Sequence, residues 1–169
     1  MATAEERLME WLRDAHAMEE QAEQMLSSTA GRLQNYPELR AELERHCEET
    51  RQQAAMVRSC IERRGGSTSS LKDIAGKVTA IGQGLSGMFV GDEVVKAAMA
   101  SYTFEQMEIA SYKTLIATAE IVGDNETKRV CEEILRQEES MASWLDRSLA
   151  AVTRDYLARE ATPEATAKH

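Results

Sequence analysis

Residues 98–115 read AMASYTFEQMEIASYKTL and contain the pattern that is most informative about the fold. Small and apolar residues recur there at spacings of three and four, which is the pattern of a helix with one buried face. Glu105 and Glu108 fall in the same series, between Ser101 and Tyr112. The pattern therefore predicts a helix that turns two carboxylates toward the interior of the protein.

Three further long helices are expected around this one. Thr3 and Glu6 have the spacing of a capping box, and Pro37 suits the first turn of a helix. Glycines at 65 and 123 supply C-terminal stops. The expected helices run from 3 to about 31, from 37 to 64, from 92 with Asp92 as cap to 123, and from Asp124 or Asn125 to about 158.

The segment 67–91 differs in composition, because it contains a Ser-rich stretch and five glycines. We expect it to be a long connection with a short, weak helix at 71–80. Four long helices then form two hairpins joined by a crossover between the second and third helices, an all-α four-helix bundle. Residues 1–160 are expected to form one domain, followed by a flexible tail at 161–169.

Composition narrows the class of protein. The chain has 169 residues, 43% of them hydrophobic, and a formal charge of -9, which argues against binding to nucleic acid. Its three cysteines show no CxxC spacing, so neither a disulfide framework nor a thiolate zinc site is indicated. Residues 1–7 do not look like a secretory signal, and no segment is long and apolar enough to span a membrane. A cytoplasmic protein is expected.

Each of the other expected helices also places a carboxylate among its apolar positions. Glu19 continues the apolar series of the first helix, and Glu138 does the same in the fourth. On the second helix Glu49 shares a face with His46, although Thr50 competes with Glu49 for the inward position. All four helices are therefore expected to bring at least one carboxylate toward the core.

These carboxylates are also expected at one height. Glu19 and Glu49 lie 30 residues apart around the first expected turn, and Glu108 and Glu138 lie 30 apart around the turn between the third and fourth helices. At about 1.5 Å per residue, each pair lies roughly 22 Å from its turn. Both pairs can therefore meet in one layer near the middle of the bundle.

The negative charge of carboxylates in an apolar core must be compensated, because burying one unpaired ion costs on the order of several kcal/mol. No Lys or Arg occupies these inward positions. Protonation, internal water or bound cations remain as explanations, and carboxylates with one imidazole suit iron or manganese. The competing interpretation is that some of the 23 Glu residues match by chance and face solvent.

Four short motifs carry a resemblance to known proteins: LRDAHAME at 12–19, HCEETRQQ at 46–53, EQMEIASY at 105–112, and Glu138-Glu139. Together they resemble the ferritin-like superfamily, and more closely the YciE/YciF-type bacterial stress proteins. The resemblance covers most of residues 5–155. It implies a four-helix bundle with a crossover, a dinuclear metal site in the core, and a homodimer.

The chain departs from the ferritin-like pattern in its imidazoles. Such iron proteins commonly place a His three residues after the Glu of the second and fourth helices, where this chain has Gln52 and Met141. His46 precedes Glu49 by one turn instead, so it is either a ligand or a residue that orients a carboxylate. Glu105 is a candidate for a fifth carboxylate ligand.

The candidate metal ligands are Glu19, Glu49, Glu105, Glu108, Glu138 and His46. His16 is a weaker candidate, which can simply pack beside Glu19. Tyr112 either hydrogen-bonds to a ligand or is an ordinary core aromatic.

These residues predict a di-metal protein with two divalent ions, iron in preference to manganese. It would act in oxidative or general stress by reducing oxygen or peroxide or by oxidising iron. The alternative is a helical interaction or structural stress protein whose site is vestigial and holds no metal. A third possibility is a di-iron oxygenase, for which nothing in the sequence names a substrate.

Overall fold

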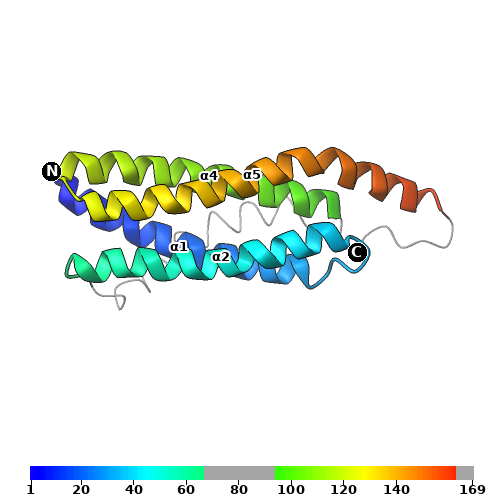
Figure 1. Cartoon of the computed structure of the whole chain (residues 1–169), viewed down its shortest axis with the longest axis horizontal. Helices are drawn as coiled ribbons and strands as arrows, with labels where there is room; N and C mark the ends of the chain where they lie inside the picture. Colours follow the sequence, from blue (N-terminus) through cyan, green and yellow to red (C-terminus); the bar gives the residue numbers. More distant parts are fainter. Residues whose placement is uncertain (67–93, 163–169) are drawn as a thin grey trace.

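The computed structural model describes residues 1–66 and 94–162. Within these ranges the chain forms four long helices and no strand: α1 (Ala4–Ala30), α2 (Pro37–Arg63), α4 (Val94–Val122) and α5 (Asn125–Glu160). The helices lie side by side in one elongated bundle (Figure 1). The predicted all-α four-helix bundle is confirmed.

The ends of the helices follow local sequence signals. The Thr3 hydroxyl accepts a hydrogen bond from the Glu6 backbone N–H at 3.2 Å, and the Glu6 carboxylate accepts one from the Thr3 N–H at 2.8 Å. This is the predicted capping box of α1. Asp124 caps α5, and Gly123 follows α4 with a φ of 75°, a left-handed conformation that glycine adopts without strain.

The helices pair as two hairpins, α1 with α2 and α4 with α5, and the hairpins meet through α1 against α4 and α2 against α5. Ile61, near the end of α2, shares an apolar cluster with Leu8. Val94, at the start of α4, shares the other cluster with Leu26. The end of α2 and the start of α4 therefore lie toward opposite ends of the bundle (Figure 1), as the expected crossover of a ferritin-like bundle requires.

Three expectations lie outside the described residues. These are the weak helix at 71–80, the cap at Asp92, and the C-terminal tail beyond 162.

The apolar core is divided into two halves. The half near the start of α1 includes Leu8, Leu12, Val57, Ile61, Leu115, Ala119, Val130 and Ile134. The half near the turn between α1 and α2 includes Leu26, Leu33, Leu39, Leu43, Val94, Ala98, Leu145 and Tyr156. Between them lies a set of buried polar residues, here called the polar layer: Glu19, His46, Thr50, Gln53, Ser101, Glu105, Glu108 and Glu138.

An ion-pair network ties the end of α2 to the start of α5. Asp124 accepts hydrogen bonds from Arg63 at 2.6 Å, from Arg64, and from the hydroxyl of Thr127 at 2.7 Å. Burial alone would raise the pKa of Asp124, but these hydrogen bonds outweigh it and lower that pKa well below its usual range. The network fixes the ends of two helices that no hairpin turn connects.

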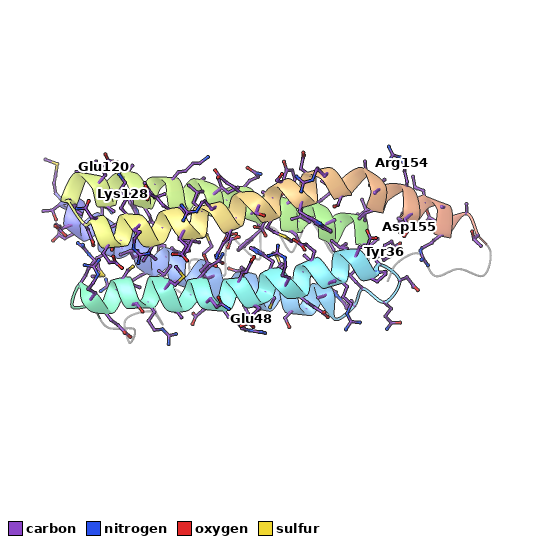
Figure 2. All side chains as sticks on the ribbon, viewed as in Figure 1. Tyr36, Glu48, Glu120, Lys128, Arg154 and Asp155 are labelled. Atoms are coloured by element: carbon purple, nitrogen blue, oxygen red, sulfur yellow. The ribbon has the colours of Figure 1, made fainter. Side chains whose placement is uncertain are left out.

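None of the described helices combines enough length with enough apolar sequence to cross a lipid bilayer. Charged side chains instead cover the outside of the bundle, as Glu48, Glu120 and Arg154 illustrate in Figure 2.

Candidate metal centre

Four ionisable side chains converge in the polar layer. They are His46 from α2, Glu105 and Glu108 from α4, and Glu138 from α5. One nitrogen or oxygen from each lies within 4.8 Å of all the others. Each of the four residues is at most 1% exposed. The group thus offers three carboxylates and one imidazole in a space closed to solvent.

His46 connects three helices in this group. Its Nε2 atom lies 3.3 Å from Glu105 Oε2 and 3.3 Å from Glu138 Oε2. The imidazole therefore lies between the carboxylates of α4 and α5. Of the two roles left open for His46 by the sequence, the structure supports that of a candidate ligand.

Glu19 brings α1 into the polar layer. The side chain is fully buried, and its Oε1 atom accepts a hydrogen bond from the hydroxyl of Tyr112. Glu19 also lies close enough to Glu138, Glu105 and His46 to be influenced by their charges. The burial of Glu19 confirms the prediction, made from helix periodicity, that this side chain points inward. Of the two roles considered for Tyr112, the structure shows that of a hydrogen-bond donor to a candidate ligand.

Burial and mutual repulsion raise the proton affinity of these carboxylates. The pKa values of Glu19 and Glu108 lie well above their usual range, because burial and then the neighbouring carboxylates disfavour the ionised form. Burial raises the pKa of Glu105 to about 8. Burial alone would lower the pKa of His46, but contacts with Glu105 and Glu138 raise it to about 11. Without another cation, these raised pKa values favour the protonated forms of Glu19, Glu105, Glu108 and His46.

Many of the donor atoms have no hydrogen-bond partner among the described residues. They are Nε2 of His46, both carboxylate oxygens of Glu138, and one oxygen each of Glu19, Glu105 and Glu108. Orphaned buried polar atoms are rare and call for an unseen ion or water. No Lys or Arg occurs among the buried polar residues in the described part of the chain. This donor set fits a divalent transition metal.

Glu49 lies outside the converging group. Its side chain is 28% exposed, and the inward position that it contested is held by Thr50, which is 1% exposed. Glu49 instead contacts Arg45 and the Nδ1 atom of His46. The structure therefore brings together five of the six candidate ligands in the polar layer and places Glu49 behind His46.

His16 faces a different part of the molecule. It is fully buried, and its Nε2 atom accepts a hydrogen bond from Arg58 Nε at 3.3 Å. Burial, with Arg58 nearby, lowers the pKa of His16 despite the opposing effect of Glu20. His16 is thus a neutral imidazole whose acceptor nitrogen is already engaged.

Gln52 and Met141, which replace the histidines of the ferritin-like pattern, supply no imidazole to the centre. Gln52 is exposed, and Met141 belongs to an apolar half of the core. A neighbouring pair, Gln53 and Gln137, joins α2 to α5 by a hydrogen bond of 2.9 Å. Helix periodicity does not predict Gln137 as a residue of the polar layer, because Gln137 is only partly buried and directly precedes the inward Glu138.

The chain is similar to a known protein family and to solved structures. A family model described as "Domain of unknown function (DUF892)" matches residues 3–158. A crystal structure of a protein from Xanthomonas campestris pv. campestris is 38% identical, with a TM-score of 0.78, and the match covers 94% of this chain and 99% of that chain.

A second similar structure comes from Rhodopseudomonas palustris and is a protein named YcfI, provisionally called a structural protein. It is 24% identical, with a TM-score of 0.68, and the match covers 86% of this chain and 94% of that one. At this identity the likeness concerns the fold. The family match, by contrast, takes in the whole polar layer and nearly the full length of all four described helices, and on that basis the chain belongs to the DUF892 family.

Proposed function

We propose that this protein binds two divalent transition-metal ions in its polar layer, iron in preference to manganese, and acts as a ferritin-like di-metal protein of the YciE/YciF type in oxidative or general stress. The observation that carries the proposal is the convergence of His46, Glu105, Glu108 and Glu138, all buried, with donor atoms that lack hydrogen-bond partners among residues 1–66 and 94–162. Such a group is costly unless a cation compensates it.

The residues that would hold the ions are Glu19, Glu105, Glu108, Glu138 and His46. Four carboxylates carry four negative charges when ionised, and two divalent ions would balance them. Carboxylate oxygen and imidazole nitrogen are the donors that iron and manganese accept. When bound, an iron pair would supply the capacity to reduce oxygen or peroxide. The surrounding residues would keep bulk water out, because each donor residue is at most 1% exposed.

A second candidate function is a structural or interaction protein with a metal-free core. The missing imidazoles at Gln52 and Met141 favour it, as does the description of the Rhodopseudomonas palustris protein. Protons would then compensate the carboxylates, in agreement with the raised pKa values of Glu19, Glu105 and Glu108. The two candidates differ in one measurable quantity, the metal content of the purified protein.

The deciding experiment is plasma mass spectrometry on untagged protein from cells grown with added iron or, separately, manganese. We expect about two ions per chain in the wild type, as in carboxylate-bound two-metal sites. Glu108→Ala and Glu138→Ala should lower that content. Glu139→Ala is the matched control, because Glu139 is the neighbour of Glu138 and its side chain is 48% exposed. Unchanged stoichiometry in both buried variants would reject the proposed site, and a metal-free wild type would support the structural role.

A further inference from the structure

Glu49 is the one candidate ligand that lies beside the polar layer without entering it. Its Oε2 atom is 3.0 Å from Nδ1 of His46, and its Oε1 atom accepts a hydrogen bond from Arg45. The Glu49 side chain is 28% exposed, whereas that of His46 is 1% exposed. The carboxylate thus lies at the boundary between solvent and the buried imidazole.

Arg45 is itself held in place. It pairs with Glu42 through two of its guanidinium nitrogens, with Nε at 3.1 Å from Glu42 Oε2. The contacting pairs 42 and 45, 45 and 49, and 46 and 49 are each three or four residues apart along α2, the spacing at which side chains of a helix meet. A string of charged groups on one helix therefore fixes the orientation of the Glu49 carboxylate.

This contact determines which ring nitrogen of His46 faces the centre. A carboxylate oxygen accepts hydrogen bonds, so the 3.0 Å contact with Glu49 favours a hydrogen on Nδ1. Nε2 then remains for the carboxylates of Glu105 and Glu138, each at 3.3 Å. Histidine ligands of metals generally donate their second ring N–H to such a partner, which fixes the tautomer and the ring orientation.

We propose that Glu49 is a positioning residue for the metal centre, which holds His46 with Nε2 aimed at the ion and does not itself bind the ion. This inference rests on the proposed function. Both oxygens of Glu49 already have partners, and turning them inward would break the contacts with Arg45 and His46. Thr50 also fills the inward position next to it.

The proposal accounts for the departure from the ferritin-like pattern. A Glu followed three residues later by a His is replaced on α2 by His46 followed three residues later by Glu49. The imidazole takes the inward position, and the carboxylate supports it from behind. The carboxylate that α2 no longer supplies is matched by Glu105, the additional inward carboxylate on α4.

The test compares Glu49→Gln with Glu49→Ala in the full-length protein, because a glutamine oxygen can still accept the Nδ1 hydrogen but cannot replace a carboxylate ligand. The readouts are the dissociation constant for Mn²⁺ and, on the Mn²⁺-loaded protein, the pulsed-EPR coupling of directly bound imidazole nitrogen. We expect Glu49→Gln to match the wild type within about twofold. Glu49→Ala should weaken binding by about 10- to 100-fold and reduce the nitrogen coupling.

Two further variants complete the series. Glu48→Ala is the matched control, since Glu48 is the adjacent residue on the outer side of α2 (Figure 2) and pairs with Arg51 at 2.9 Å. It should leave both readouts unchanged. His46→Ala should abolish the nitrogen coupling. Circular dichroism of each metal-free variant checks the helical fold, and because Glu49 is partly exposed we expect that fold to persist.

Three outcomes would overturn the inference. Equal loss of Mn²⁺ in the Gln and Ala variants would make Glu49 a carboxylate ligand. Wild-type affinity and nitrogen coupling in Glu49→Ala would show that His46 needs no support. A wild type that binds no Mn²⁺ and no iron would remove the proposed function together with this inference, which separates that failure from the other two.

Discussion

The hydroxyl group of Tyr112 holds the carboxyl group of Glu19 in the polar layer. Tyr112 is fully buried, and its hydroxyl donates to Oε1 of Glu19 from a position 93 residues away in the sequence. The other oxygen of Glu19 has no partner among the described residues. The hydroxyl therefore provides the one protein hydrogen bond that compensates Glu19 within the described part of the chain.

Removing this hydroxyl should be costly. We expect Tyr112→Phe to destabilise the metal-free protein by about 1–3 kcal/mol, because it leaves both oxygens of a buried carboxyl group unpaired. Urea denaturation measures the change. Tyr102→Phe is the control, since Tyr102 lies on the same helix but bonds to Asp146 at the surface. A loss in Tyr102→Phe equal to that in Tyr112→Phe would contradict the assignment.

At the scale of the helices, one residue joins two elements that are not neighbours in the chain. Asp124 caps α5 through the backbone N–H of Thr127 at 3.1 Å and also pairs with Arg63 and Arg64 at the end of α2. Its side chain is only 7% exposed. The carboxylate thus serves both the start of one helix and the packing between the two hairpins.

The two roles of Asp124 can be separated by substitution. Asp124→Asn keeps a capping side chain but removes the charge, whereas Asp124→Ala removes both. We expect the alanine variant to be less stable than the asparagine variant by about 0.5–2 kcal/mol, the usual value of a helix cap. Urea denaturation at pH 7 measures the order of the two. Equal stabilities would mean that the cap contributes nothing here.

The charge of Asp124 also has a pH signature. Because the pKa of Asp124 is lowered in the folded protein, its ion pairs stabilise the fold above the unfolded value of about 3.9. That contribution is lost as the pH falls further, when the carboxylate takes up a proton. The difference in stability between wild type and Asp124→Asn should therefore shrink from pH 7 to pH 3. A difference that stays constant would show that charge is not involved.

Across the whole molecule, a layer of ionisable groups separates two apolar halves that would otherwise form one core. The layer crosses all four described helices, so its protonation state affects the packing of the entire bundle. In metal-free protein, Glu19 and Glu108 retain protons at pH values where an unfolded chain would release them. Bound ions would take the place of these protons, because a carboxylate must ionise to bind a metal.

This arrangement predicts the pH dependence of stability without metal. The raised pKa values of Glu19, Glu105 and Glu108 mean that the folded state binds more protons than the unfolded state above about pH 4.3. The stability should then fall as the pH rises from 5 to 8, and the raised pKa of His46 acts in the same direction above about 6.5.

Thermal unfolding of chelator-treated protein at pH 5.5 and pH 8 checks this slope. The melting temperature should be lower at pH 8. The Glu19→Gln, Glu108→Gln double variant should show a smaller decrease, because two of the groups that bind the extra protons are gone. A melting temperature that rises with pH would mean that the polar layer is ionised in the metal-free protein.

Local sequence signals are sufficient to predict the helices and most of the inward carboxylates. Local signals mark the helix ends: the capping box at Thr3, the start of α2 at Pro37 and the glycine stop at 123. Each acts through hydrogen bonds or backbone conformation within a few residues of the helix end. Glu19 and Glu138 were predictable as buried because apolar residues flank each of them one turn away on both sides. Periodicity along one helix is sufficient for that conclusion.

The rotation of α2 about its axis and the side-chain contacts between helices depend instead on how the helices pack. At about 100° per residue, Glu49 and Thr50 lie on either side of the direction of His46, so both fit the same series. Packing of α2 against α1 and α5 selects Thr50 and leaves Glu49 at the edge. The bond from Tyr112 to Glu19 likewise depends on contacts between helices, which the spacing of residues within one helix does not contain.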